Sequence, residues 1–253
     1  MSTKEKTMNW SQRCSFAIAA LCCVVPSVAQ TIESISFHRV KQDRIGDFLT
    51  ANKEYTDIVR KLGTDRYFSM WESLSGDREF VRITYQDKYA DFDRGADPKT
   101  KDQAGVLREL VARMSQCQGD THRIIAEIQP ALSLPQSMEL PKMIRVSRSD
   151  VKGDKVEEYV ALMKNETLPA IKKSGVKAYK VLRIRYGGSL AEFAAVTGFD
   201  SWGDLDGGSA VQKGMAPAAY ERLLTRLGEL TVHRETNIYR LVPNATYMPS
   251  MAK

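Results

Sequence analysis

The sequence predicts an α+β protein made of two tandem copies of one β-α-β-β-α-β unit, and three observations support this fold class. A twelve-residue segment, TYQDKYADFDRG at residues 84–95, recurs as TGFDSWGDLDGG at residues 197–208. Strand-like and helix-like hydrophobic patterns follow one another in the same order in both halves. Residues 129–141 contain three prolines, which are typical of a connection between two folded units.

The repeated segment is the strongest sign of duplication. The two copies are identical at five positions with a constant offset of 113, where Thr84, Asp87, Asp91, Asp93 and Gly95 match Thr197, Asp200, Asp204, Asp206 and Gly208. Each copy follows an apolar strand, so we expect Asp87 and Asp200 to cap a short helix and Asp91 and Asp204 to favour its dipole. The aligned aromatic residues Tyr89 and Trp202 are expected to pack this helix onto the sheet.

In the first unit, residues 32–40 alternate in hydrophobicity and predict a strand. Residues 44–62 have the spacing of an amphipathic helix, which Gly63 ends as a C-terminal cap. Two aromatic and β-branched segments, 66–72 and 79–85, predict a hairpin. A second helix is expected at residues 104–117 and a last strand at 122–128.

The same order restarts after the linker. Strands are expected at residues 143–147, 178–186, 192–199 and 231–241, and helices at 155–173 and 217–228. Pro169 is expected to bend or interrupt the first of these helices, because proline cannot donate the helical hydrogen bond. The predicted organisation is therefore unit 1 at residues 30–133, a linker at 134–141 and unit 2 at 142–253.

The first 29 residues have the pattern of a cleaved signal peptide. Lys4, Lys6 and Arg13 precede or flank an apolar run at residues 14–25, and small residues follow it. The run is too short to span a bilayer, so no membrane span is expected after cleavage, and the sequence predicts export to the periplasm or outside the cell. Cleavage would lower the net charge from +6 to +4 without leaving a basic block, which does not indicate a nucleic-acid partner.

Three of the four cysteines lie in the predicted signal, which leaves Cys117 as the one cysteine of the mature chain. An intrachain disulfide is then excluded, and the fold must depend on its hydrophobic core. Cys117 ends a predicted helix, where we expect it to be a buried packing residue.

The two units resemble the dimeric α/β barrel superfamily, on the basis of an apolar third strand (FVRITY, FAAVTG) that leads into an aromatic-and-aspartate helix start. This superfamily includes antibiotic-biosynthesis monooxygenases, NIPSNAP proteins and haem-degrading monooxygenases. The resemblance implies two ferredoxin-like units packed sheet to sheet, here as an intramolecular pseudo-dimer within one chain. Its haem-degrading members use a histidine on the second helix, which neither predicted second helix contains, so that activity cannot be carried over.

Histidine and arginine supply the candidate site residues. The pairs His122-Arg123 and His233-Arg234 occur near the fourth strand of each unit at an offset of 111. If an alignment gap of two residues is allowed, the pairs correspond, and two interpretations remain open: a pocket for an anionic or haem-like ligand, or an inherited surface pair. His38 on the first strand is a third candidate, which lines a cavity or faces solvent.

Two functions from different classes remain open, beside a third possibility of a structural or assembly role in which an exposed sheet edge pairs with another chain. The first is binding of a small apolar or aromatic ligand or of a protein partner, with Trp71 and Tyr85 as candidate aromatic contacts. The second is a cofactor-independent or haem-linked monooxygenase, in which His38, His122 or His233 would be catalytic and Arg123 or Arg234 would bind the ligand. The aspartate spacing does not fit a calcium loop, so no metal site is predicted, and a homodimer is left open.

Overall fold

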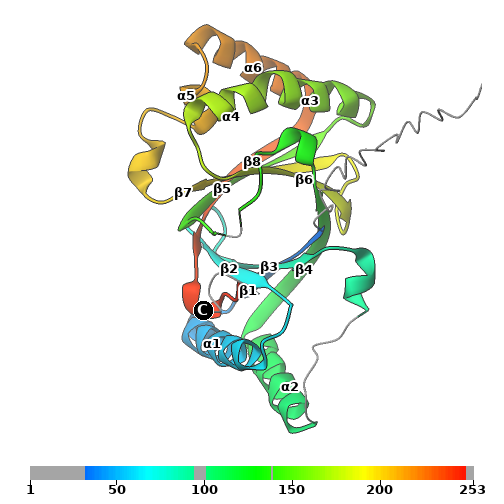
Figure 1. Cartoon of the computed structure of the whole chain (residues 1–253), viewed down its shortest axis with the longest axis vertical. Coiled ribbons are helices and arrows are strands. Elements are labelled where there is room, and N and C mark those ends of the chain that lie inside the picture. The colour runs from blue at the N-terminus through cyan, green and yellow to red at the C-terminus, as the bar shows by residue number, and fades with distance from the viewer. Residues whose placement is uncertain (1–31, 94–100, 138, 249–253) are drawn as a thin grey trace, which may run out of the picture.

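A computed structural model describes residues 32–93, 101–137 and 139–248, which form one closed barrel with helices on two opposite sides (Figure 1). The strands of unit 1 are β1 (Ile32–Val40), β2 (Phe68–Ser73), β3 (Phe80–Gln86) and β4 (Gln118–Ile128). Those of unit 2 are β5 (Met143–Val151), β6 (Tyr179–Tyr186), β7 (Glu192–Phe199) and β8 (Thr231–Leu241). Residues 1–29, which carry the predicted signal peptide, lie outside the described residues.

The helices follow the predicted order. In unit 1 they are α1 (Ile45–Leu62) and α2 (Lys101–Gln116), and in unit 2 they are α3 (Val156–Leu162), α4 (Leu168–Ser174), α5 (Ala210–Lys213) and α6 (Pro217–Leu230). Short 3-10 turns are η1 (Gln42–Arg44), η2 (Tyr89–Phe92), η3 (Pro130–Leu132), η4 (Gly153–Lys155), η6 (Trp202–Leu205) and η7 (Pro243–Ala245). Gly63 and Gly175 end the first helix of each unit in the left-handed conformation that glycine adopts without strain.

The strands of the two units join into one sheet. Their order around the barrel is β1-β3-β2-β8-β5-β7-β6-β4, and every pairing is antiparallel. Pairing of β2 with β8 and of β4 with β6 joins unit 1 to unit 2. The predicted intramolecular pseudo-dimer of β-α-β-β-α-β units is therefore confirmed.

The inside of the barrel is filled with side chains from both units. A single apolar cluster includes Ile35, Trp71 and Ile124 from unit 1 and Leu182 and Val196 from unit 2. Such packing removes from water the sheet face that each unit alone would expose, and it is worth about 25 cal/mol for each Å² buried. The centre of the barrel is therefore a shared core, and ligand space has to be sought outside it.

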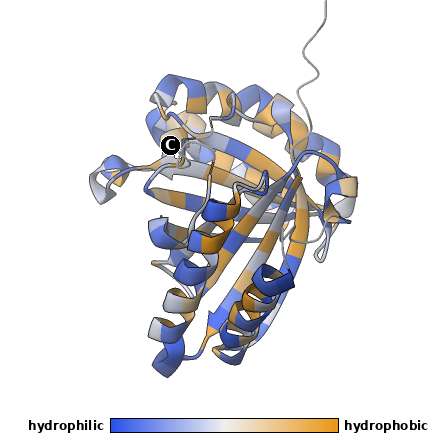
Figure 2. Cartoon of the chain, turned by 60° about the horizontal axis from the view of Figure 1, so that its bottom comes forward, coloured by the Kyte–Doolittle hydropathy of each residue, from blue (hydrophilic) through white to orange (hydrophobic). Residues whose placement is uncertain are grey.

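The outer face of each half-barrel is covered by its own helices. Phe48 of α1 and Leu110 and Met114 of α2 pack on Met70 and Phe80 of the unit 1 sheet. The helices α3, α4 and α6 cover the unit 2 sheet on the opposite side (Figure 1). Figure 2 shows hydrophobic and hydrophilic residues interleaved along helices and strands, as expected for elements with one buried face. Cys117 is buried in the unit 1 layer, as predicted, and its Sγ lies 3.2 Å from the carbonyl oxygen of Arg113.

The repeated segments form η2 and η6, but with a different cap from the one predicted. The carboxylate of Asp204 accepts backbone N–H bonds from Asp200 at 2.8 Å and Ser201 at 3.0 Å, and Asp91 accepts the equivalent bonds in unit 1. The prediction that Asp87 and Asp200 cap these turns is wrong. Asp91 and Asp204, four residues later, accept the first N–H groups of the turns instead.

The aromatic residues of the repeat do not act as core. Trp202 is 53% exposed and Tyr89 is 41% exposed, so the prediction that they pack the turn onto the sheet is wrong. The Tyr89 hydroxyl instead donates to Glu127 at 2.9 Å, and its ring packs edge-on against Tyr186.

The first helix of unit 2 is continuous around Pro169. A π-helical turn at Met163–Thr167 joins α3 to α4, and Pro169 lies in the first turn of α4. The segment from Val156 to Ser174 is one residue longer than α1, and the π-turn accommodates the extra residue. Proline is tolerated at this place because it lies in the first turn of α4.

Candidate functional site

Each unit contains a cavity between the outer face of its sheet and its helices. The unit 2 cavity has a volume of about 700 Å³ and lies between β5, β7 and β8 and the helices α3, α4 and α6. The unit 1 cavity has a volume of about 560 Å³ and lies between β1, β3 and β4 and the helices α1 and α2. Both volumes are in the range of sites for small organic molecules.

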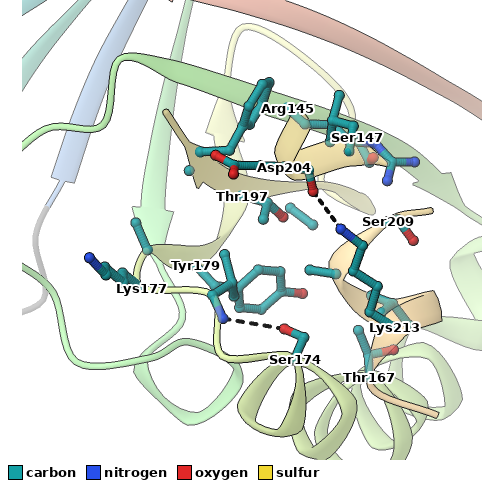
Figure 3. Close-up of a pocket in the computed structure, with 18 of the residues that line it drawn as sticks. Arg145, Ser147, Thr167, Ser174, Lys177, Tyr179, Thr197, Asp204, Ser209 and Lys213 are labelled. Carbon is teal, nitrogen blue, oxygen red and sulfur yellow. Dashed lines mark hydrogen bonds between the residues drawn. The ribbon is translucent and has the colours of Figure 1, made fainter. Parts of the chain in front are cut away.

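The unit 2 cavity combines an apolar wall with a hydroxyl-rich wall. Leu223 and Leu227 of α6 supply apolar surface, and Thr197 of β7 and Ser147 of β5 lie on the sheet side. Figure 3 shows Thr197 and the ring of Tyr179 projecting into the space between the sheet and the helices. These residues lie on the outer sheet face because strand side chains alternate between the core and the helix layer.

Two hydroxyl groups of this cavity lack a hydrogen-bond partner. The hydroxyl oxygens of Tyr179 and Thr167 are buried, and neither contacts a donor or acceptor among the described residues. Burial raises the pKa of Tyr179 far above its ordinary value, so the hydroxyl stays protonated and can donate. A buried polar group left without a partner costs about 1–3 kcal/mol, so water or a ligand is expected to supply one.

The π-turn places Thr167 at the cavity. Met163 and Thr167, at the two ends of the turn, both line the space, and both are buried. An extra residue in an unbroken α-helix would turn the residues after it by about 100°, whereas the π-turn takes it up locally and keeps the same face of α4 toward the sheet. The extra residue of unit 2 therefore shapes the cavity wall.

Two arginines add positive charge to the unit 2 cavity. Arg145 on β5 and Arg234 on β8 both line it. Burial lowers the pKa of the half-buried Arg145, and Tyr220 partly offsets this effect. The charge of Arg234 also lowers the pKa of Arg145, so the two guanidinium groups are within electrostatic range of each other. Neither makes an ion pair among the described residues, so both are available to an anionic or strongly polar ligand group.

At the cavity mouth, the repeated segment meets α5. The ammonium group of Lys213 on α5 donates to the carbonyl oxygen of Asp204 at 2.6 Å, which joins α5 to η6 (Figure 3). The helix α5 has no counterpart in the predictions, because its four residues are too few to give a periodic pattern.

The unit 1 cavity contains His38, Arg82 and Arg123. Burial lowers the pKa of His38, a contact with Gln118 partly offsets this, and the two arginines lower it further. Of the sequence candidates, His38 and Arg123 therefore lie together, and the structure adds Arg82 to them. Arg234 lies in the other cavity.

His122 and His233 lie outside both cavities. Both side chains are exposed, on the opposite side of their strands from Arg123 and Arg234. His122 stacks on Phe37, and His233 is 70% exposed at 3.9 Å from Glu235. Neither histidine is placed to contact a ligand in these two cavities.

The two His-Arg pairs are not equivalent. Ser36 of β1 pairs with Arg123, but Ser147, which occupies the same place on β5, pairs with Thr236. The last strands are thus related by the offset of 113, and the alignment gap that matched the pairs at 111 is wrong. The His-Arg dipeptide of β8 therefore lies two residues nearer the start of its strand than the His-Arg dipeptide of β4 does.

Trp71 and Tyr85 face the inside of the barrel. The indole Nε1 of Trp71 donates to Ser69 Oγ at 2.8 Å, and the Tyr85 hydroxyl lies 2.9 Å from the same oxygen. Trp71 belongs to the shared core. Both residues therefore stabilise the packing of the barrel and are separated from the cavities by the sheet.

Several residues of the two cavities were not predicted: Arg82, Arg145, Thr167, Tyr179 and Thr197. One available signal is the run of polar residues at alternate positions of the strands, such as Ser34, Ser36 and His38, which lie opposite apolar neighbours. That pattern is also typical of a solvent-exposed sheet face, so it cannot distinguish a cavity from a surface before the helices are placed.

Other site types find little support among the described residues. No group of three or more histidine, cysteine, aspartate or glutamate side chains is close enough there to hold a metal ion. Across the same residues, no helix has the length and hydrophobicity needed to cross a membrane.

Comparison of the sequence with family models and with curated proteins finds no match. Comparison of the structure finds similar solved structures at low identity. A candidate monooxygenase from Fusobacterium nucleatum matches with a TM-score of 0.58 and 12% identity, over 85% of this chain and 93% of that one. One from Lactobacillus acidophilus matches with a TM-score of 0.60 and 9% identity, over 87% and 99%.

An anthrone oxidase-like protein matches with a TM-score of 0.58 and 13% identity, over 87% of this chain and 93% of that one. At such identities the likeness concerns the fold, and function has to be argued from the cavities. The match covers both units, in agreement with the barrel order described above. The chain has the fold of the dimeric α/β barrel superfamily, with both ferredoxin-like units in one polypeptide.

Proposed function

We propose that the protein binds a small aromatic molecule carrying a phenolic hydroxyl, and that the ligand occupies the unit 2 cavity. The observation that carries the proposal is the pair of buried hydroxyls, Tyr179 and Thr167, that find no partner within the described residues. A polar group on the ligand would complete their hydrogen bonds and recover the cost of burying them.

The rest of the cavity suits the same ligand. Leu223 and Leu227 offer apolar surface to a ring, and a few polar groups on the sheet side would fix its orientation. Arg145 lies close to this polar side without a carboxylate partner, and its positive charge would favour the ionised form of a phenol. A phenol would thus be bound with its oxygen toward the sheet.

Oxygenation of such a ligand without a cofactor is the second candidate function. Two observations favour it: the charge of Arg145 and Arg234 beside a cavity for an aromatic ring, and the likeness to candidate monooxygenases and an anthrone oxidase-like protein. An ionised phenol is electron-rich and can donate an electron to dioxygen. For a ring CH₂ group the balanced change is R₂CH₂ + O₂ → R₂C=O + H₂O, in which one oxygen atom enters the product and the other leaves as water.

Haem is a weaker proposal for this chain. The unit 2 cavity has no histidine or cysteine among the described residues that line it, so its donors do not fit a histidine-ligated haem. In the unit 1 cavity His38 is the remaining imidazole, but its Nδ1 is shielded and Gln118 contacts the ring. Ligation of a haem iron would compete with this contact between His38 and Gln118.

We also propose, from the sequence alone, that residues 1–29 direct export and are removed. The periplasmic or extracellular location is proposed on the same basis. A homodimer is left open by the sequence, and the fold does not require one because both halves of the barrel lie in one chain. Expression of the full chain and sequencing of the mature N-terminus would test the cleavage after Ala29.

The ligand proposal is tested with anthrone and 1-naphthol as probes, by calorimetric titration of residues 30–253. Tyr179→Phe removes the buried hydroxyl and should weaken binding about three- to tenfold, and Arg145→Gln should weaken it about tenfold or more. Tyr186→Phe is the matched control, because Tyr186 is 60% exposed and does not line the cavity. Its affinity should equal that of the unchanged protein.

Oxygen uptake in the same samples separates binding from catalysis. Uptake with anthrone that Arg145→Gln lowers would support the monooxygenase, and binding without uptake would leave a ligand-binding protein. If neither probe binds, or if Tyr186→Phe weakens binding as much as Tyr179→Phe, the unit 2 cavity is not the phenol site.

A further inference from the structure

The unit 1 cavity contains a pair of arginines around a single serine. Ser36 on β1 lies between Arg82 on β3 and Arg123 on β4, since it pairs with both in the sheet register. Neighbouring strands are about 4.8 Å apart, so the two arginines start about 10 Å from each other on the same face. Guanidinium groups from both sides can converge on a ligand above Ser36.

Neither arginine has a carboxylate partner among the described residues. Arg123 Nε donates to Ser36 Oγ at 3.0 Å, and the guanidinium of Arg82 lies 3.9 Å above the centre of the Phe68 ring and 4.8 Å from that of Tyr55. Nine of the fifteen other arginines among the described residues form ion pairs, namely Arg39, Arg44, Arg60, Arg78, Arg113, Arg148, Arg185, Arg226 and Arg240.

The aromatic contacts fix the Arg82 guanidinium in place. Arginine stacked on two rings has lost most of its side-chain freedom before any ligand arrives, so little further entropy is lost on binding. Burial lowers the pKa of Arg82, and the nearby Tyr55 partly offsets this effect. The arginine remains charged nonetheless. An anion between the arginines would compensate this partly buried charge.

His38 adds a neutral hydrogen-bonding side chain to this site along β1, since burial and the two arginines lower its pKa. It lies two residues from Ser36 on the same face, and its Nδ1 is buried without a hydrogen-bond partner among the described residues. The helices α1 and α2 contribute apolar side chains to the wall, namely Phe48, Val59, Leu107 and Met114, while Arg66 and several uncharged polar side chains line the remainder. The cavity therefore offers a positive end and an apolar end.

Unit 2 has no equivalent of this arrangement. The residue that corresponds to Arg82 is Ala195, and the one that corresponds to Arg123 is Thr236, because both pair with Ser147 as the arginines pair with Ser36. The arginines of the unit 2 cavity come from other strand positions. The two cavities are thus chemically different, and a ligand suited to one is not expected in the other.

From these contacts we propose that the unit 1 cavity is a second, separate binding site for a small aromatic or aliphatic carboxylate. The carboxylate lies between Arg82 and Arg123 above Ser36, and the apolar body of the ligand packs between α1 and α2. The proposal does not depend on the function of the unit 2 cavity.

Benzoate serves as the probe and inorganic phosphate as the comparison, each titrated calorimetrically into residues 30–253. Arg123→Gln should weaken benzoate binding about tenfold or more, and Arg82→Gln should do the same. Arg123 is exposed, so its replacement leaves the hydrophobic core unchanged. Arg39→Gln is the matched control: Arg39 is next to His38 on β1, but its side chain is exposed and paired with Asp77. Arg145→Gln controls for benzoate in the unit 2 cavity.

The proposal holds if Arg39→Gln and Arg145→Gln bind benzoate within about twofold of the unchanged protein while Arg123→Gln does not. It is overturned if benzoate does not bind, if Arg123→Gln has no effect, or if Arg39→Gln is equally weakened, which would indicate general charge attraction. Loss of binding in Arg145→Gln alone would place benzoate in unit 2. Phosphate binding as tight as that of benzoate would contradict the apolar part of the site.

Discussion

At the scale of single residues, the aspartates of the repeat act on the backbone. Asp204 accepts N–H bonds from Asp200 and Ser201, and these bonds lower the pKa of its carboxyl below the ordinary value of 3.8. A carboxylate with a depressed pKa stabilises the fold above the unfolded pKa, and this contribution is lost as the pH falls through the folded value. The shape that the two repeats share thus has a local cause in the backbone N–H bonds to Asp91 and Asp204.

Replacement of Asp204 by asparagine should therefore lower the melting temperature at neutral pH, with a difference that shrinks as the pH falls below about 3.8. Thermal unfolding followed by circular dichroism over a pH series measures this. Asp206→Asn makes the same charge change in the same exposed loop and should have little effect. A difference for Asp204→Asn that is constant down to low pH would mean that the carboxylate charge does not matter.

At the scale of elements, two glycines have opposite roles. A Cβ atom at Gly214 would lie 1.8 Å from the carbonyl oxygen of Ala170, so α5 can approach α4 this closely only with glycine there. A Cβ at Gly105, inside α2, would meet nothing within 4 Å. The first glycine is required by packing, and the second only weakens its helix.

The matched substitutions should consequently change stability in opposite directions. Gly214→Ala should lower the free energy of unfolding by about 1–3 kcal/mol, since α5 must move away. Gly105→Ala should raise it by about 0.5–1 kcal/mol, because alanine is the better helix former. Urea unfolding of both variants tests this, and a neutral Gly214→Ala would show that α5 can shift without cost.

The order of elements was predictable from the sequence because long periodic segments dominate it. The strands β1 and β7 and the helix α1 begin and end within one residue of their predicted bounds. The π-turn and α5 were not predictable, because one extra residue and a four-residue helix leave no periodic trace. The start of β4 came four residues earlier than expected, since none of its first four residues has an apolar side chain.

The cavities were less predictable than the fold. His38 and Arg123 were found because their residue types are rare or paired, and Arg82 and Tyr179 were missed because in sequence they look like ordinary strand residues. The prediction that the two His-Arg pairs are equivalent was wrong because it assumed the wrong register for β8. That register depends on the pairing of β8 with β5, which a dipeptide cannot define. Sites formed between distant elements require the three-dimensional arrangement.

At the scale of the whole molecule, a buried ion pair crosses the junction of the units. Lys180 on β6 of unit 2 pairs with Glu33 on β1 of unit 1, and their side chains are 15% and 0% exposed. The Lys180 ammonium also lies 5.6 Å from the centre of the Tyr85 ring. The pair links the two halves inside the barrel, where removal of one partner would leave a buried charge.

Lys180→Met should accordingly lower the free energy of unfolding by about 3–5 kcal/mol, because Glu33 would remain buried and unpaired. Glu33→Leu combined with Lys180→Met should recover most of the loss. Chemical denaturation of the single and double variants measures the difference, with Lys177→Met as an exposed control. Equal losses in the single and double variants would show that the pair is not coupled.

The shared core predicts that neither unit is stable alone. Residues 30–133 and 140–253, expressed separately, would each expose one apolar face that the other unit covers. We expect each fragment to self-associate or unfold, as measured by light scattering and far-ultraviolet circular dichroism. A fragment that unfolds cooperatively as a monomer would contradict a core held in common.

The single-chain barrel has a genetic consequence. In a barrel made of two identical chains, every substitution appears twice and must suit both sites at once. Here each codon changes one half only, so one cavity can be altered while the other keeps its residues. The positions occupied by Arg82 and Arg123 in one half and by Ala195 and Thr236 in the other are an instance of this freedom. A tandem gene can therefore hold two unlike specificities within one folding unit.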